Sequence, residues 1–294
     1  MSQSTASRLM FSDAIGMTSP IVVSFLECSL NAQRTFGRSE GHRGTRQRSA
    51  CRARVLTDAS SGAVSGHFSA AELDWLLPRA IGTTGSSPLI PGESLAAVYA
   101  LVDKVAAIYQ YPMYINSFEL SGQEAQYLNW AFNMVGGAQV TWGSAWPTVV
   151  PASPDCGDAA SFADVVFNYG GTAFPLQSFR LAVDNAIDSQ QYENSITPTR
   201  FESQDLIVSL EVQCAFRADT SALHRAAIAG AAAFLQVGVG AATYTFHFGN
   251  LKIPNGGPTI PRVGRITQSL TMESYRTAST GTAATDNQLR IVKA

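Results

Sequence analysis

The chain has 294 residues, of which 46% are hydrophobic and 14% are charged, and its formal net charge is −2. This length and apolar content allow a sizeable core in one large or two small domains, and the near-neutral charge gives no global sign of nucleic-acid binding. Because roughly 25% of residues are charged in ordinary soluble domains, we expect part of the surface to be buried against other subunits.

The four cysteines are scattered without the spacing of a zinc or redox motif, so a reducing compartment is expected. Residues 1–19 are polar and lack the apolar segment of a signal peptide. Residues 226–246 carry no charge over a length that could span a membrane. Their Ala, Gly and Thr content instead predicts a helix followed by strands, so no membrane span is expected.

Strand patterns dominate the chain. The clearest covers residues 206–217, where six apolar residues alternate with a mostly polar set, which predicts a long half-buried antiparallel strand. Residues 179–183 alternate likewise, and a phase shift after Gly249 suggests a β-bulge. The other predicted strands cover residues 21–30, 52–56, 95–105, 113–120, 244–248, 264–275 and 290–293.

Two short helices are predicted among the strands. The first follows the capping-box spacing of Ser69 and Glu72 and ends near Pro78. The second covers about residues 220–233 and carries small side chains that allow close packing. Together these elements predict a mainly β protein, an antiparallel β-sandwich or barrel with one or two short flanking α-helices.

A weak internal similarity joins "NSFELSG" at residues 116–122 to "QSFRLAV" at residues 177–183. The stretch between them, "WGSAWPTVVPASPDCGDAAS", is rich in residues typical of loops. We predict a single domain over residues 1–294. An alternative is that it consists of two halves, 1–145 and 160–294, joined by this loop-rich stretch.

An arginine-rich window covers residues 34–54, where seven arginines accompany a single acid, Glu40, so that the window carries +6 and the rest of the chain −8. Phe36 is its one aromatic residue, so a stacking platform for single-stranded nucleic acid is absent. The window is either a basic element that docks on an acidic face of another copy or a solvated basic loop.

Acidic residues cluster after the strand at residues 179–183, where Asp184, Asp188, Glu193 and Glu202 suggest a metal or acid/base site. The strand pattern breaks at Asn185, so no helix face unites the two aspartates, and turn or cap roles are commoner for such residues. The four histidines are far apart, and motifs for a serine nucleophile or a dinucleotide are missing. We therefore predict no catalytic residue, no metal site, no cofactor and no enzymatic activity.

The order of motifs along the chain resembles the tail tube proteins of tailed bacteriophages, in particular the larger type of roughly three hundred residues. The resemblance rests on four stretches and covers nearly the whole chain. They are "GHRGTRQR" at 41–48, "ELDWLLPRAIG" at 72–82, "SFELSGQEAQYLNWAFNMVGG" at 117–137, and "LAVDN" at 181–185 followed by the strand at 206–216. The small residues at 226–233 and the basic loop depart from the family pattern.

The resemblance implies a structural virion protein. Sheets of neighbouring protomers would join into a β-barrel ring, commonly a homohexamer, and stacked rings would form a hollow tube through which DNA is ejected. Expected partners are other copies of the chain, a tail terminator, a baseplate or tip, a tape measure and, in contractile tails, a sheath. DNA would pass only transiently, no membrane would be involved, and assembly would occur in the host cytoplasm.

In such a tube, Ser209, Glu211 and Gln213 are candidates for the lumen, because they lie opposite the apolar row of their strand and would let DNA slide. In an ordinary sandwich the same residues would simply face solvent. The candidate inter-ring contacts are Arg34, Arg38, Arg43, Arg46, Arg48, Asp184, Asp188 and Glu193.

Two other functional classes stay open from the sequence. A β-sandwich binding module, either carbohydrate-binding or capsid-decorating, could use Trp142, Trp146 and Tyr192 for stacking, although the two tryptophans also suit a loop anchor. An enzyme with a paired carboxylate ranks last.

Overall fold

The computed structural model describes residues 7–38, 53–83, 87–143, 146–147, 159–259, 266–277, 283 and 285–294. The strands before residue 145 are β1 (Arg8–Ser12), β2 (Ile21–Val22), β3 (Glu27–Cys28), β4 (Asn31–Arg38), β5 (Ala53–His67), β6 (Val98–Asp103), β7 (Ile108–Gln123), β8 (Asn129–Gly136) and β9 (Val140–Thr141). Helix α1 (Ala70–Ala80) lies between β5 and β6.

The later strands follow a 3-10 turn, η3 (Phe162–Asp164). They are β10 (Val165–Tyr169), β11 (Thr172–Phe174), β12 (Ser178–Asp184), β13 (Asp188–Gln191), β14 (Arg200–Glu202), β15 (Ile207–Ala215), β16 (Ala231–Val239), β17 (Ala242–Thr259), β18 (Thr267–Tyr275) and β19 (Arg290–Lys293). Helix α2 (Ala218–Ala229) lies between β15 and β16.

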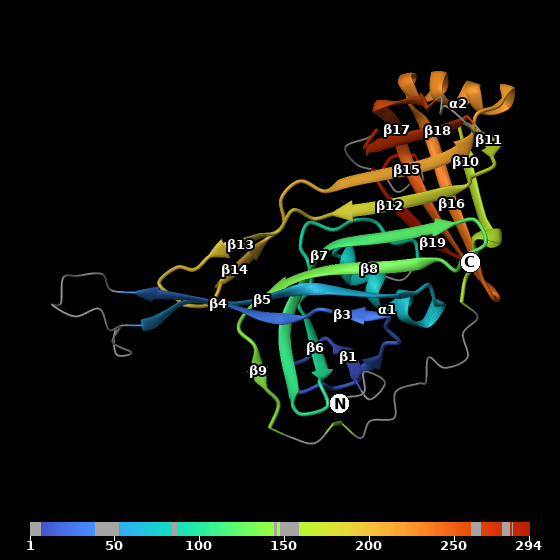
Figure 1. Ribbon diagram of the computed structural model, residues 1–294. Coiled ribbons are helices and arrows are strands. Elements are labelled where there is room, and N and C mark those ends of the chain that lie inside the picture. Colours follow the sequence, from blue (N-terminus) through green and yellow to red (C-terminus); the bar gives the residue numbers. More distant parts are fainter. Residues whose placement is uncertain are drawn as a thin grey trace.

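Eight strands form a continuous antiparallel row in the order β4, β5, β8, β7, β12, β15, β18, β17, which we call the main sheet (Figure 1). β3 continues the line of β4 along β5. In β7, β8, β12, β15 and β18, alternate residues are largely buried and the residues between them lie on a polar face, whereas none of the described side chains of β4 is buried. The mainly β, antiparallel sandwich predicted from the sequence is confirmed.

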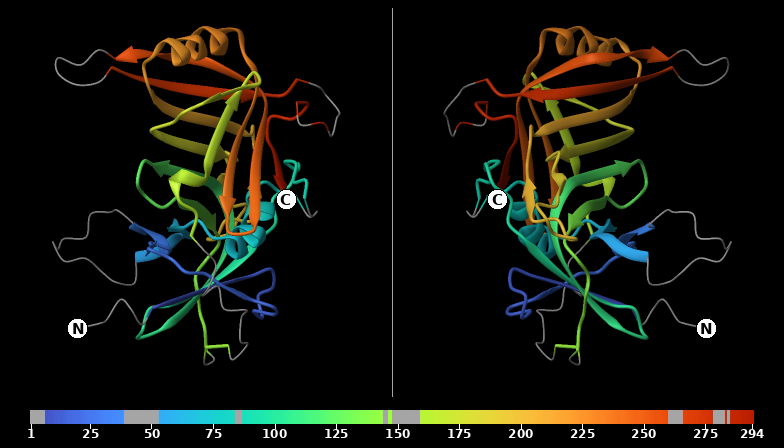
Figure 2. Two further views of the ribbon diagram at one scale, coloured as in Figure 1. Left: turned by 90° about the vertical axis from the view of Figure 1, so that its right-hand side faces the viewer. Right: turned by 90° about the vertical axis from the view of Figure 1, so that its left-hand side faces the viewer.

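The first halves of β7 and β17 leave the main sheet and pair with β6 and β16, which in turn pair with β1 and β10. Apolar side chains of both layers and of α1 form one continuous core. Its largest fully buried members include Trp130, Phe118, Phe132 and Phe246. Figure 2 shows α2 at one end of the molecule and the β1–β6 layer toward the other.

The same set of pairings occurs twice along the chain. Pairs β1–β6, β4–β5, β5–β8, β6–β7, β7–β8 and β7–β9 recur as β10–β16, β12–β15, β15–β18, β16–β17, β17–β18 and β17–β19. The two similar sequences, at 116–122 and 177–183, lie on β7 and β12, which pair with each other where the two sets meet. Whether residues 1–145 and 160–294 are separate halves stays a prediction.

Several predicted strands have different bounds. Residues 21–30 do not form one strand, because the backbone N–H of Ser24, between β2 and β3, donates to the carboxylate of Glu72 instead of to a strand. The strand predicted at residues 52–56 is only the start of β5, whose Ser- and Gly-rich continuation hides its alternation. Phe216, the sixth apolar residue of the 206–217 pattern, lies beyond β15 and is exposed.

The helices also differ in detail from the prediction. α2 ends at Ala229, because Gly230 adopts a φ of 84° and the following alanines enter β16. α1 includes Pro78 and continues to Ala80. The predicted capping box does not form, since the Ser69 hydroxyl makes no cap hydrogen bond to the helix backbone. The β-bulge predicted after Gly249 is confirmed by a register shift between β16 and β17.

Candidate assembly surfaces

The lumen candidates Ser209, Glu211 and Gln213 lie on the polar face of β15. Val208 and Leu210, which alternate with them, are completely buried. The predicted inward and outward faces of this strand are therefore present, and the three candidates lie on one surface of the main sheet.

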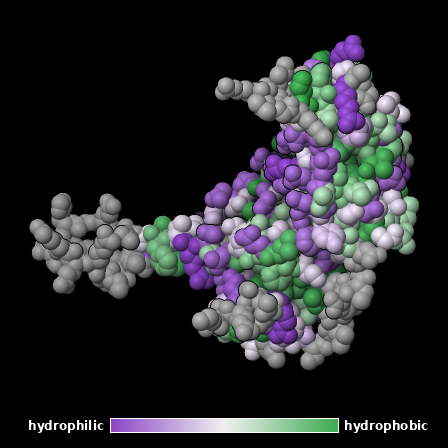
Figure 3. Space-filling model, turned by 45° about the vertical axis from the view of Figure 1, so that its right-hand side comes forward, coloured by the Kyte–Doolittle hydropathy of each residue, from purple (hydrophilic) through white to green (hydrophobic). Residues whose placement is uncertain are grey.

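Small and polar residues flank these three on the neighbouring strands. They are Ser178, Arg180 and Ala182 on β12, Ser269, Thr271 and Glu273 on β18, and Glu119, Ser121 and Gln123 on β7. Ser178 Oγ donates to Gln213 Oε1 at 3.2 Å, and Arg180 lies 2.7 Å from Glu119. Figure 3 shows hydrophilic residues gathered over the middle of this side of the molecule.

Electrostatically this face is mixed and weakly acidic. The hydrogen bond and charge of Glu119 raise the pKa of Arg180, and the charge of Glu211 adds to the effect. The arginine is therefore engaged by carboxylates of the protein. Since tight DNA binding needs several cations aimed at phosphates, this face suits a surface past which DNA moves without being held.

The β4–β5 hairpin carries the arginine window and projects from the body of the molecule (Figure 1). Arg34 pairs with Asp58 of the same hairpin, its Nε lying 3.1 Å from a carboxylate oxygen. Phe36 and Leu56, on the two strands of the hairpin, are 62% and 57% exposed. The side chain of Arg38 and the whole of Arg43, Arg46 and Arg48 lie outside the described residues.

The acidic candidates between β12 and β15 bind local partners. Asp184 Oδ1 accepts from the N–H of Ala186 at 2.9 Å, and Asp188 Oδ1 accepts from the N–H of Gln190 at 2.9 Å. The second bond and a bond from Gln191 lower the pKa of Asp188. These contacts are the turn roles that aspartates commonly fill.

Glu193, the third acidic candidate, lies at a tight turn and pairs with Arg200 across 3.2 Å. Of the residues that the structure describes, no three His, Cys, Asp or Glu side chains gather in a way that could hold a metal ion. The three acidic candidates thus have partners at residues 186–200, close to them in the sequence.

This segment packs beside the stem of the β4–β5 hairpin. The N–H of Asp58 donates to the carbonyl of Ile196 at 2.6 Å. A polar groove between the two is lined by Gln33 and Thr57 from the hairpin and by Ser189 and Tyr192 from the segment. The stem of the β4–β5 hairpin and the acidic segment therefore lie side by side within one chain, although the sequence separates them by more than a hundred residues.

A family model described as phage tail tube protein matches residues 4–274. The chain belongs to this family. The resemblance stated from the sequence is thereby confirmed, and it makes the protein a structural component of a phage virion. No curated protein matches the chain. Neither helix in the described part of this tail tube protein is long and apolar enough to cross a membrane.

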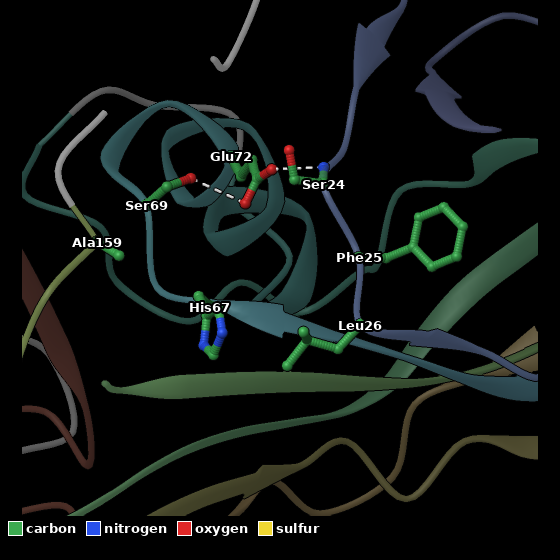
Figure 4. A pocket seen from close by; sticks show the side chains of 7 residues that line it. All are labelled: Ser24, Phe25, Leu26, His67, Ser69, Glu72 and Ala159. Carbon is green, nitrogen blue, oxygen red and sulfur yellow. Dashed lines mark hydrogen bonds between the residues drawn. The ribbon is translucent and has the colours of Figure 1, made fainter. Parts of the chain in front are cut away.

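One pocket of this tail tube protein contains a buried carboxylate, that of Glu72 (Figure 4). Glu72 accepts hydrogen bonds from the N–H of Ser24 at 2.6 Å and from the hydroxyl of Ser69 at 2.8 Å. Burial raises its pKa above the ordinary value, an effect that these bonds oppose. The carboxylate thus ties the segment between β2 and β3 to the start of α1, a structural use that the capping-box spacing did not predict.

The aromatic residues proposed for a binding module have structural contacts as well. Trp142 and Trp146 pack partly buried against a small apolar cluster around Met10 and Leu101. The guanidinium of Arg8 lies 4.4 Å from the ring centre of Trp146. The exposed pair Phe36 and Leu56 was not predicted from the sequence, although the two residues lie on either side of an arginine-rich stretch.

Proposed function

We propose that the chain assembles into rings, of sixfold symmetry as the sequence leads us to expect, and that the rings stack into the hollow tail tube that conducts DNA during ejection. The main sheets of neighbouring protomers would form the barrel wall, with the polar face lining the lumen. Ser209, Glu211 and Gln213 would lie on that lining, and the role would be structural, not enzymatic.

The observation that supports this proposal best is the shape of the main sheet. In the middle of the main sheet, β7, β8, β12, β15 and β18 bury one face in the core and leave the other face polar and weakly charged. A barrel wall needs this division, since its outer face must join the core and its inner face must meet water and DNA.

Other copies of the chain would be the main partner, together with a terminator, a baseplate or tip, a tape measure and, in contractile tails, a sheath. The inter-ring contact would join the arginine-rich hairpin of one ring to the acidic segment at 184–193 of the next. Assembly would take place in the host cytoplasm before the tube enters the virion.

Electron microscopy of the purified chain tests the proposal directly. Hollow tubes or stacked rings are the expected result, and class averages give the ring symmetry. Monodisperse monomers at every concentration and salt level tested would contradict it.

The lumen assignment has its own test, the triple variant Ser209→Lys, Glu211→Lys and Gln213→Lys. Its tubes should retain fluorescent DNA that native tubes release, because added cations in the channel bind phosphates. A matched control is Ile228→Lys at an exposed position on α2, which should not change DNA retention. Equal retention by native tubes and by the triple variant would place these residues elsewhere.

A further inference from the structure

Two strand segments at opposite ends of the main sheet have one edge without a partner. Residues 255–259 of β17 pair only with β18, and β3 and β4 pair only with β5, in the part of the chain that is described. Figure 1 shows β4 and β17 far apart at the two ends of the sheet. Such edges present backbone N–H and C=O groups that can pair with another strand, and within residues 255–259 of β17 only Pro258 lacks the N–H.

Around the two helices, the two sets of pairings share landmarks at the same spacing, which indicates that the sets repeat one unit. The helices α1 and α2 begin at Ala70 and Ala218, 148 residues apart. Gly82 and Gly230, which both have positive φ behind their helices, are also 148 apart. The register between β7 and β8 shifts once, and the register between β17 and β18 shifts once as well. The two units therefore match strand by strand.

The junction between the two units is already present within one chain. β7 of the first unit pairs with β12 of the second, with Ser117 opposite Asp184 and Glu119 opposite Ala182. The counterpart of β7 in the second unit is β17, and the counterpart of β12 in the first unit is the line of β3 and β4. The open edge of β17 and the open edge of the β3–β4 line are therefore the two edges that lack a pairing equivalent to that of β7 with β12.

The correspondence between the two sets of strands also predicts which residues of β17 and of the β3–β4 line would face each other. Ser117 and Asn255 correspond, because each is the first paired residue after the shift in its strand. Asp184 and Gln33 correspond, because their partners on β15 and β5 are again 148 residues apart. Within the chain Ser117 faces Asp184, so Asn255 should face Gln33 of a neighbouring chain.

We propose that β17 of one chain pairs antiparallel with the β3–β4 line of the next chain, with Asn255 opposite Gln33 and Gly257 opposite Asn31. This inference rests on the proposed function and specifies the contact within a ring. Asn31 and Gln33 are exposed at polar-face positions of the sheet, so the polar face continues across the contact. Repetition of this head-to-tail contact closes a ring that contains an even number of units and no open edge.

Cysteine cross-linking tests the register. In the full chain, Gln33→Cys with Asn255→Cys should give covalent ladders under mild oxidation, because paired residues in antiparallel strands have Cβ atoms about 5 Å apart. The matched control, Gln33→Cys with Thr259→Cys, moves one cysteine four residues along β17, or about 13 Å, and should give none. The single variants report any cross-links made by the native cysteines. Equal or stronger ladders in the control would overturn the proposed register.

Hydrogen exchange of the native chain tests the contact without any substitution. Amides that face the open edges, in particular those of residues 30, 32 and 256, should become at least ten times slower on assembly. Ser29 already donates to Ala63 within the chain and Pro258 has no N–H, while β15, which is paired on both edges, should change little. If rings are seen by microscopy but these amides stay fast, this inference is wrong and the proposed function stands. If no rings form under any condition, the proposed function itself fails.

Discussion

The β4–β5 and β12–β15 hairpins hold the same place in their two sets of strand pairings, but their described residues make different contacts. The connection between β12 and β15, residues 185–206, folds back as the small β13–β14 hairpin. It is anchored by Asn185, whose side-chain amide donates to the carbonyls of Ala80 and Ile115 at 2.8 and 2.9 Å. The β4–β5 hairpin instead extends beyond the body and exposes Phe36 and Leu56.

This difference shows that two hairpins with equivalent strand pairing can differ in the contacts they make beyond the paired strands. Strand pairing places both hairpins in the main sheet, and the described parts beyond the pairing differ in what they expose. In the folded connection the acids already have partners, whereas the projecting hairpin combines exposed apolar side chains with an arginine-rich sequence. Such a combination is typical of contact surfaces.

The largest effect is expected from Arg43→Ser, Arg46→Ser and Arg48→Ser combined. This variant should remain folded, because the three positions lie between β4 and β5 in the sequence, outside both strands, but its tubes should be shortened or absent in electron micrographs. The physical reason is the loss of positive charge that would meet an acidic surface of the next ring. Full-length tubes of the triple variant at high salt would contradict the idea.

A charge-matched partner variant sharpens the same comparison. Asp184→Asn, Asp188→Asn and Glu193→Gln remove the opposite charge while keeping a side-chain oxygen for the local turn bonds. If the two regions meet across rings, combining both triple variants should cost little more than either alone, since interacting sites are not additive. Fully additive losses of tube length would show that the two regions contact different partners.

The next largest effect concerns the anchor of the folded connection. Asn185→Ala should lower the free energy of unfolding by about 2–3 kcal/mol, because two buried carbonyls lose their donors. Urea denaturation of the dissociated chain measures it. Gln204→Ala, at an exposed position in the same connection, is the control and should change stability by less than about 0.5 kcal/mol. A neutral Asn185→Ala would mean that the segment is held by other contacts.

The sequence predicted the parts of the fold that alternation and composition encode. β15, the bulge after Gly249 and the buried row of β15 followed from a period of two, which a half-buried strand imposes. Most of β5 was missed because serine and glycine replace apolar residues along it. The helix predicted at 220–233 was too long because alanine suits both a helix and the tightly packed start of β16.

The candidate surfaces were predictable only in part, for a physical reason. Ser209, Glu211 and Gln213 follow from the parity of one strand, so their shared face could be read directly. The neighbourhood of the β4–β5 stem and residues 185–206 depends on contacts between distant segments, such as the bond from Asp58 to Ile196. One sequence contains no signal for such a contact.

A smaller effect distinguishes the starts of the two helices. Glu72 in α1 corresponds to Thr220 in α2, 148 residues later, and both are buried. Because burial raises the pKa of Glu72 above its ordinary value of 4.5, the folded state binds the proton more tightly than the unfolded state. Stability from this group is full at lower pH and is lost as the pH rises from 4.5 through the raised pKa. Unfolding free energies measured across this range should decline less in Glu72→Gln than in the native chain.

Thr220 carries no such charge, so the pH effect should belong to the first helix alone. Glu124→Gln removes an exposed carboxylate and serves as the control, with an unchanged slope. A slope in Glu72→Gln as steep as that of the native chain would assign the pH dependence to another group.

The smallest effect separates the junction within the chain from the proposed junction between chains. Arg180 and Glu119 form an ion pair across β12 and β7, and their counterparts in the proposed contact are Ser29 and Gly257, which carry no charge. Because the Arg180 side chain is 57% exposed, Arg180→Gln should lower the free energy of unfolding by only about 0.5 kcal/mol, and 1 M salt should remove the difference. The ring contact, lacking this pair, should keep its hydrogen-exchange protection at the same salt concentration. If Arg180→Gln lowers the free energy of unfolding by 2 kcal/mol or more, the ion pair is essential to the β7–β12 junction. The proposed contact between chains, which has no such ion pair, would then be too weak to close a ring.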